Sequence, residues 1–151
     1  MKTNKIALLY ILLIFGLLTF NKSCNERNET VSCFPNSAIS VSLNLNLVSY
    51  YDLNNVGGWI YVNQVGAGTQ GLIVVRTSSG FKVYDRNAPH LCPNGTDDTV
   101  LKVQDGTKIV CPKDNAQWIL LTGQPISVAK VAPKSYAYSY DPNTNILSVY
   151  N

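Results

Sequence analysis

DRNAPHLCPNGTDDTVLKVQDGTKIVCPKDNAQWILLTG, residues 85–123, is the stretch that decides the fold. It contains two short loops that each carry a proline and a cysteine, Ala88-Pro89-His90-Leu91-Cys92 and Cys111-Pro112-Lys113-Asp114-Asn115. Between them, the apolar runs at 100–103 and 108–110 flank an Asp105-Gly106 pair. An Asp-Gly turn between two such runs predicts a β-hairpin, which is expected to bring the two loops side by side.

Short strands are predicted on both sides of this stretch. Residues 38–47 alternate strictly between apolar and polar side chains, which predicts a strand with one solvent-facing side. Residues 72–76 are β-branched and nearly all apolar, which predicts a strand buried on both faces. Further strands are expected at 59–62, 81–85, 116–121, 136–140 and 146–150, and no convincing helix is found. The pattern predicts an all-β antiparallel sandwich or small barrel.

The N-terminus has the features of an export signal of the lipoprotein type. Residues 1–23 contain a basic start and an apolar run over 6–20, and this run is short for a membrane span of about 20 residues. Cleavage before Cys24 would make this cysteine the lipid-modified first residue of a bacterial lipoprotein, whereas an uncleaved signal anchor is the alternative. Residues 24–37 are predicted to be a flexible tether and residues 38–151 the folded domain. The expected location is the outer membrane, the cell surface or the periplasm.

The charge balance changes when this signal is set aside. The whole chain has 12 Lys and Arg and 9 Asp and Glu, but residues 1–23 include Lys2, Lys5 and Lys22 and no acidic residue. Residues 24–151 therefore carry 12 − 3 = 9 basic against 9 acidic side chains. No basic excess remains for binding phosphates, so nucleic acid is not expected as a partner.

The two loops resemble those of Rieske domains, in which Cys-x-His from one loop and Cys-x-x-His from a second loop hold a [2Fe-2S] cluster. The chain resembles Rieske-fold lipoproteins of the kind found in Bacteroidetes in the pieces VYDR (83–86), APH (88–90), CPKDNAQWILLTGQ (111–124) and VYN (149–151). This resemblance covers nearly all of residues 38–151 and implies a Rieske-like β domain with the two loops at one end. The implied ligand positions are Ala88, His90, Cys111 and Asp114.

Only half of the implied ligand set is of the required type. Alanine offers no donor atom at the first thiolate position, and aspartate replaces the second imidazole. We therefore expect no cluster and no other cofactor, and no bound metal; the less favoured alternative is a single zinc or iron ion on His90, Cys111 and Asp114. The predicted function is a non-enzymatic binding or scaffolding module of the cell envelope. The alternative is a Rieske ferredoxin that transfers electrons through a [2Fe-2S] cluster.

Partners follow from the same features. The expected partners are the membrane, through the lipid on Cys24, and an envelope protein or glycan. Tyr136, Tyr138 and Tyr140 share one predicted strand face and form a candidate aromatic binding surface, although most aromatic side chains of a sheet lie in its core. An enzyme built on His90 is disfavoured because this is the only histidine and no catalytic partner is placed near it by sequence.

The cysteines suggest a cross-link between the loops. Export favours disulfides, and three cysteines remain besides Cys24, so at least one is free or pairs outside the domain. If the Rieske-like fold holds, Cys92 can reach Cys111. That bridge would close 18 intervening residues and contribute about 3 kcal/mol of stability in the chain-entropy model.

Overall fold

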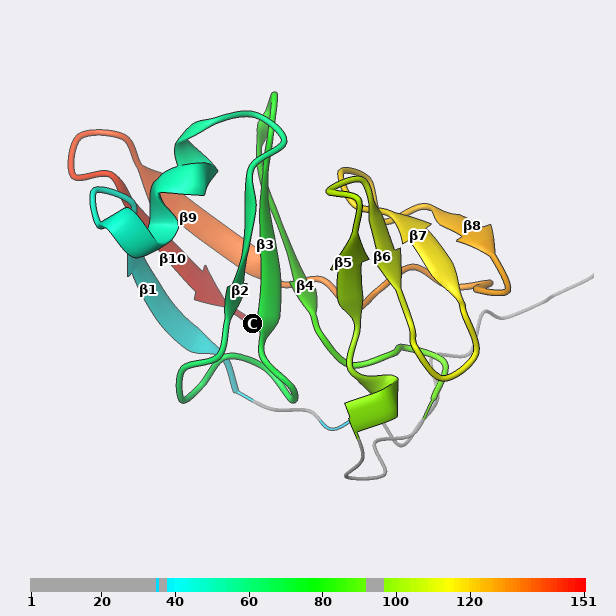
Figure 1. The fold of residues 1–151 in the computed structure, drawn as a ribbon. Coiled ribbons are helices and arrows are strands. Elements are labelled where there is room, and N and C mark those ends of the chain that lie inside the picture. The colour runs from blue at the N-terminus through cyan, green and yellow to red at the C-terminus, as the bar shows by residue number, and fades with distance from the viewer. Residues whose placement is uncertain (1–34, 36–37, 92–96) are drawn as a thin grey trace, which may run out of the picture.

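The structure is a computed structural model that describes residues 35, 38–91 and 97–151. The elements are β1 (Ser40–Asn44), η1 (Val48–Asn54), β2 (Trp59–Val62), β3 (Leu72–Thr77), β4 (Gly80–Asp85), η2 (Asp97–Thr99), β5 (Lys102–Gln104), β6 (Lys108–Val110), β7 (Gln117–Ile119), β8 (Pro125–Ser127), β9 (Ala137–Asp141) and β10 (Ile146–Tyr150). They form three antiparallel sheets in the described part of the chain, with strand orders β1-β10-β9, β2-β3-β4 and β5-β6-β7-β8 (Figure 1). The predicted all-β class is confirmed.

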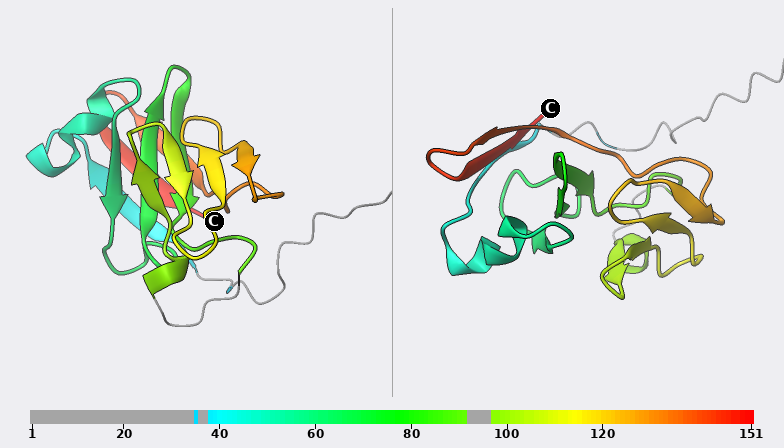
Figure 2. Two further views of the ribbon diagram at one scale, coloured as in Figure 1. Left: turned by 45° about the vertical axis from the view of Figure 1, so that its right-hand side comes forward. Right: turned by 90° about the horizontal axis from the view of Figure 1, so that it is seen from above.

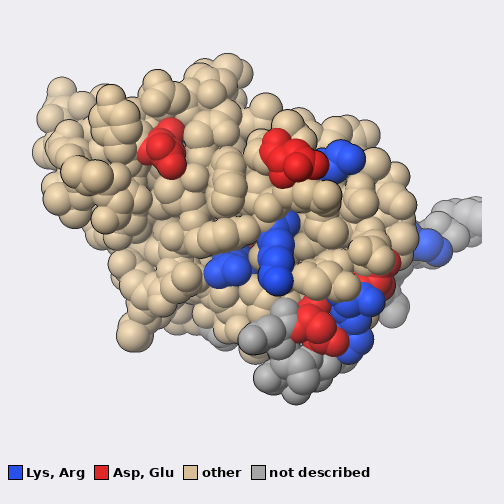
Figure 3. All heavy atoms as spheres, in the orientation of Figure 1, with Lys and Arg blue, Asp and Glu red and all other residues tan. Residues whose placement is uncertain are grey.

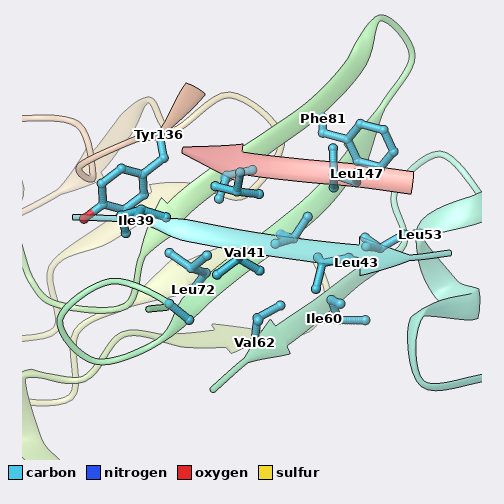
Figure 4. Close-up of a cluster of buried hydrophobic side chains, with 14 of the residues drawn as sticks. Ile39, Val41, Leu43, Leu53, Ile60, Val62, Leu72, Phe81, Tyr136 and Leu147 are labelled. Atoms are coloured by element: carbon cyan, nitrogen blue, oxygen red, sulfur yellow. The ribbon is translucent and has the colours of Figure 1, made fainter. Parts of the chain in front are cut away.

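The sheets are arranged in two lobes that lie side by side (Figures 1 and 2). The sheets β1-β10-β9 and β2-β3-β4 face each other in the larger lobe, and the four-stranded sheet makes up the smaller one. The alternation along β1 explains the packing of the larger lobe, because Val41 and Leu43 are buried between polar, exposed neighbours. Figure 4 shows how they meet Ile60, Leu72 and Leu147 from the surrounding strands in the first core.

Strand β3 separates this first core from a second one. Its side chains alternate in direction, so Leu72 and Val74 belong to the first core while Ile73 and Val75 belong to the second. All four are fully buried. The predicted burial of this strand on both faces is confirmed, and its physical reason is that one strand serves two cores.

The second core lies under the small sheet and the two loops. Its buried members are Ile73, Val75, Tyr84, Ala88, Leu101, Ile109, Cys111, Ala116, Trp118 and Leu120. Trp118 is fully buried, and its indole Nε1 donates a hydrogen bond to the carbonyl oxygen of Val131 at 2.7 Å. Since Ala88 and Cys111 are themselves core residues, both loops are anchored by apolar packing.

A buried carboxylate ties the end of β4 to two other segments. Asp85 is fully buried and accepts four hydrogen bonds, from the amide and hydroxyl of Thr69, the amide of Asn87 and the hydroxyl of Tyr136. The hydrogen bonds are 2.7 to 2.9 Å long. They compensate the loss of water around the charge and fix the point where the first loop leaves the sheet.

Two elements differ from the sequence prediction. The segment Val48–Asn54 forms a 3-10 helix where no helix was expected, and Pro125–Ser127 forms β8 at the edge of the small sheet where no strand was predicted. Tyr136, which precedes β9, and Tyr138 and Tyr140 within β9 also form no open binding face. Tyr136 is buried, and Tyr138 and Tyr140 pack edge-on against Phe81 in the first core.

The predicted signal peptide at 1–23 and the lipidation site Cys24 lie outside the described residues, as does the tether apart from residue 35. Among the described residues, no helix has the length and apolarity needed to cross a membrane.

Candidate functional site

The first loop places a histidine beside the second core. A turn spans Ala88 to Leu91, in which the Leu91 amide donates to the Ala88 carbonyl oxygen at 3.3 Å. Pro89 holds the second position of this turn, which its fixed φ favours. The amide of Ala88 donates to the carbonyl of Thr99, and its methyl group is fully buried. The imidazole of His90 thus lies at the rim of the core with 23% of its side chain exposed.

The second loop turns tightly between β6 and β7. The Cys111 amide donates to the Ala116 carbonyl, and the Asn115 amide donates to the Cys111 carbonyl, both at 2.9 Å. Asn115 has a φ of 59°, which asparagine tolerates better than most residues. The Asp114 carboxylate accepts from the amide of Ala116 at 3.1 Å, as an aspartate in a turn commonly does. This geometry brings the side chains of Cys111 and Asp114 to the same side of the loop.

A hydrogen bond between His90 and Asp114 joins the two loops. Nε2 of His90 lies 2.6 Å from Oδ2 of Asp114, and because a carboxylate can only accept, the imidazole N–H is the donor. Burial raises the pKa of Asp114, but the hydrogen bonds from His90 and the Ala116 amide, together with the neighbouring Cys111 side chain, outweigh it and leave the pKa below its usual value. The ring of His90 also rests near Trp118, with 5.8 Å between ring centroids. Its Nδ1 is buried and has no hydrogen-bond partner in the structure.

Sequence reasoning did not predict this pairing. The available signal was that the only histidine and an aspartate occupy matched positions of two loops expected to face each other. A histidine N–H and a carboxylate oxygen at facing positions can form a hydrogen bond, which is the reason to expect this pairing.

Cys111 carries a buried thiol. Its side chain is fully buried, and its Sγ donates a long hydrogen bond of 3.9 Å to the carbonyl oxygen of Asp98. Burial raises the pKa of this thiol, and the neighbouring Asp114 carboxylate raises it further, while the amides of Lys113 and Asp114 act in the opposite direction. Cys111 is free in the structure. Its predicted disulfide partner Cys92 lies outside the described residues, so the bridge stays a prediction.

The structure therefore brings together the four positions that the resemblance implies. One potential ligand atom from each of His90, Cys111 and Asp114 lies within 4.8 Å of the others, and Ala88 lies in the core beneath them. A [2Fe-2S] cluster of the Rieske type needs two thiolates and two imidazoles. The four implied positions offer one of each, and the buried methyl group of Ala88 has no donor atom for iron, so these positions alone do not supply the full Rieske donor set.

The structure also contains an open cleft, at the opposite end of the strands from His90. It has a volume of about 440 Å³ and lies between the β3–β4 turn and the turn that follows β7. It is lined by Val56, Thr77, Ser78, Ser79, Lys82, Leu121 and Thr122. Because the lining includes neither His90 nor an acidic side chain, this cleft does not extend the two-loop site into a catalytic pocket.

No family model matches the chain, and no curated protein matches it. Similar solved structures include the ferredoxin of carbazole 1,9a-dioxygenase from Nocardioides aromaticivorans IC177, with a TM-score of 0.42 and 16% identity over 75% of this chain and 96% of that one. A complex of reduced oxygenase and oxidized ferredoxin in carbazole 1,9a-dioxygenase gives a TM-score of 0.44 and 21% identity over 75% of this chain and 92% of the matched one.

A third similar structure is a small subunit assigned to an NADH-dependent nitrite reductase of Mycobacterium tuberculosis. It has a TM-score of 0.43 and 12% identity over 76% of this chain and 96% of that one. At these identities none of the three structures assigns an activity to this chain.

Proposed function

We propose that this chain is a Rieske-like domain that has lost its cluster and acts as a lipid-anchored binding or scaffolding module of a bacterial cell envelope. The proposal rests on the first of the four implied ligand positions, which is occupied by alanine, a residue that cannot bind iron. Ala88 is fully buried among the side chains of the second core, so no other residue can take its place without repacking that core. The His90–Asp114 pair joins the loops that a cluster would otherwise join.

The surface of the small sheet supports binding in place of catalysis. Four large apolar side chains within residues 119–128 are between 37% and 59% exposed: Ile119, Leu121, Ile126 and Val128. They follow one another along β7, β8 and the adjoining segments, and exposed apolar groups gathered on one hairpin are typical of contact sites. Basic side chains on the face shown in Figure 3 form small groups, several beside acidic ones, and not a continuous stripe. A protein or glycan partner suits this surface better than nucleic acid does.

Anaerobic reconstitution with iron and sulfide tests the loss of the cluster. The matched variant is A88C/D114H, which supplies two thiolates and two imidazoles at the four implied positions. Absorbance and the paramagnetic resonance of the reduced protein are measured for both chains. We expect no Rieske signal from the natural sequence and a signal from the double variant.

Two results of this experiment would contradict the proposal. A stoichiometric Rieske signal from the natural sequence would contradict the proposal and establish the electron-transfer alternative. A folded double variant without a cluster would show that the loops do not have Rieske geometry, which would also contradict it. Because a larger side chain at Ala88 costs about 1–3 kcal/mol, thermal unfolding of the variant is measured alongside.

Lipid anchoring rests on the sequence of residues 1–24. We expect the full chain, expressed with its own signal in a Gram-negative host, to incorporate labelled palmitate and to sediment with membranes. Cys24→Ser removes the acceptor thiol, and Cys33→Ser is the matched control that keeps it. Label on the Cys24→Ser protein equal to that on the control would show that anchoring does not use this residue.

A further inference from the structure

We infer that the two-loop site binds a single zinc ion, through Sγ of Cys111, a ring nitrogen of His90 and a carboxylate oxygen of Asp114. This goes beyond the proposed function, because a cluster-free binding module needs no metal. The sequence alone offered only a single Cys-x-x-Asp spacing, which is weak evidence for zinc. The structure adds the histidine from the facing loop.

The distances are close to those that zinc requires. The three ligand atoms lie within 4.8 Å of one another. Zinc bonds of about 2.0 Å to nitrogen and oxygen and about 2.3 Å to sulfur place the ligand atoms of a tetrahedral site with one sulfur roughly 3.3–3.5 Å apart. Side-chain shifts of about 1 Å therefore suffice. If Nε2 is the ligand atom, the 2.6 Å distance between Nε2 of His90 and Oδ2 of Asp114 widens by about 0.7 Å as the ion replaces the Nε2 proton.

The ligand types and their charge suit this ion. A thiolate, an imidazole and a carboxylate are the three groups that zinc uses in proteins, and a mixed set of three leaves a fourth position for water. Cys111 and Asp114 together supply two negative charges against the two positive charges of the ion. The neighbouring Lys113 does not compete for Asp114, because its ammonium group lies 3.4 Å from the carboxylate of Asp98.

The surroundings hold the ligands in place before any metal arrives. Cys111 is anchored in the second core, and the tight turn fixes Asp114 through its bond to the amide of Ala116. The ring of Trp118 restricts the movement of the His90 imidazole on one side. Preorganised ligands lose little freedom on binding, which favours a tight site.

Zinc and the predicted Cys92–Cys111 disulfide exclude each other, since both use the Sγ of Cys111. The test therefore starts from reduced protein. Purified full chain in detergent is titrated with Zn²⁺ against a competing chelator, and in parallel with Co²⁺ while the visible absorbance is recorded. We expect one equivalent of metal and cobalt bands of a tetrahedral site with thiolate charge transfer.

Three variants each remove one ligand: Cys111→Ser, His90→Gln and Asp114→Asn. Glutamine and asparagine keep a hydrogen bond between the loops, so these two variants are expected to fold, which near-ultraviolet circular dichroism checks. Each should weaken zinc binding by more than about 100-fold, because even the loss of a supporting group outside the ligand shell costs about 10- to 100-fold. Cys33→Ser is the matched control and should bind like the natural sequence.

Two results would overturn the inference. One is a set of cobalt bands without thiolate charge transfer, and the other is a Cys111→Ser protein that binds zinc as tightly as the control. Binding that appears only after reduction supports it, because the bridge removes the thiolate. Failure to bind zinc together with failure to form a cluster would reject this inference and leave the proposed function standing. A cluster in the natural sequence would reject both.

Discussion

Tyr84 shows how the second core controls a single side chain. Its ring is 2% exposed, and its hydroxyl is buried without a hydrogen-bond partner in the structure. Burial therefore raises the pKa of Tyr84 to about 12, because the phenolate would lose its solvation. A buried hydroxyl without a hydrogen-bond partner lowers stability at every pH through its lost solvation, and ionisation of the unfolded chain adds a further loss only at alkaline pH.

The stability of the protein should fall at alkaline pH for this reason. Below about pH 10 Tyr84 is neutral in both the folded and the unfolded chain, so it causes no pH-dependent loss of stability. Above about pH 10 the unfolded chain loses the Tyr84 proton before the folded chain does, and this favours unfolding. Between about pH 9 and pH 11.5 this site alone should lower the free energy of unfolding by roughly 2 kcal/mol. Urea unfolding at the two pH values measures the loss.

Tyr84→Phe separates this site from the other ionisable groups. At pH 9 the variant should be at least as stable as the natural sequence, and more stable by up to about 3 kcal/mol, since it removes a buried hydroxyl whose lost solvation no hydrogen bond compensates. Between about pH 9 and pH 11.5 the free energy of unfolding of the variant should fall by roughly 2 kcal/mol less than that of the natural sequence. The variant should still lose some stability at alkaline pH, because Tyr136 also has a raised pKa. Burial raises the pKa of Tyr136, and the neighbouring Asp85 raises it further. Equal losses in the two proteins would show that Tyr84 is not protected by the core.

Asp85 is a residue whose role the sequence could have revealed. Phe81 and Val83 point into the first core, and Asp85 has the same parity along β4. An acidic residue in line with core positions indicates a buried, hydrogen-bonded carboxylate. Apart from the nearby amide of Asn87, its partners Thr69 and Tyr136 come from two other segments of the chain, so their identity depends on the tertiary structure.

At the level of elements, alternation and turn chemistry were sufficient for most strands. The Asp105-Gly106 turn forms as predicted, and both residues have a positive φ, the conformation that such pairs favour. Strand β3 was identified by its unbroken β-branched run, because a strand between two cores has no solvent-facing side to mark with polar residues.

The missed elements lack such a pattern. The 3-10 helix η1 buries only Leu53, so its seven residues show no apolar period. Strand β8 begins at a proline and has no buried residue, as is common for an edge strand, and it is defined by its pairing with β7. Likewise, both loops of the candidate site were predicted from the sequence but the hydrogen bond between them was not, because the distance between His90 and Asp114 depends on how the two loops pack on the second core.

At the level of the whole molecule, the shared strand predicts how the two lobes unfold. Both tryptophans of the chain, Trp59 and Trp118, pack in or against the second core, so their fluorescence follows that core. Leu43 belongs to the first core and is fully buried. If β3 couples the cores, damage to the first core must also lower the stability that the tryptophans report.

Leu43→Ala tests this coupling. The cavity should cost about 2–5 kcal/mol, and the urea midpoints followed by tryptophan fluorescence and by far-ultraviolet circular dichroism should fall together. Leu101→Ala makes a matched cavity in the second core and should shift both signals in the same way. A fluorescence midpoint that stays unchanged in Leu43→Ala while the dichroism midpoint falls would mean that the lobes unfold separately. The loop pair would then depend on the small lobe alone, whereas joint unfolding makes its geometry a property of both cores through the strand they share.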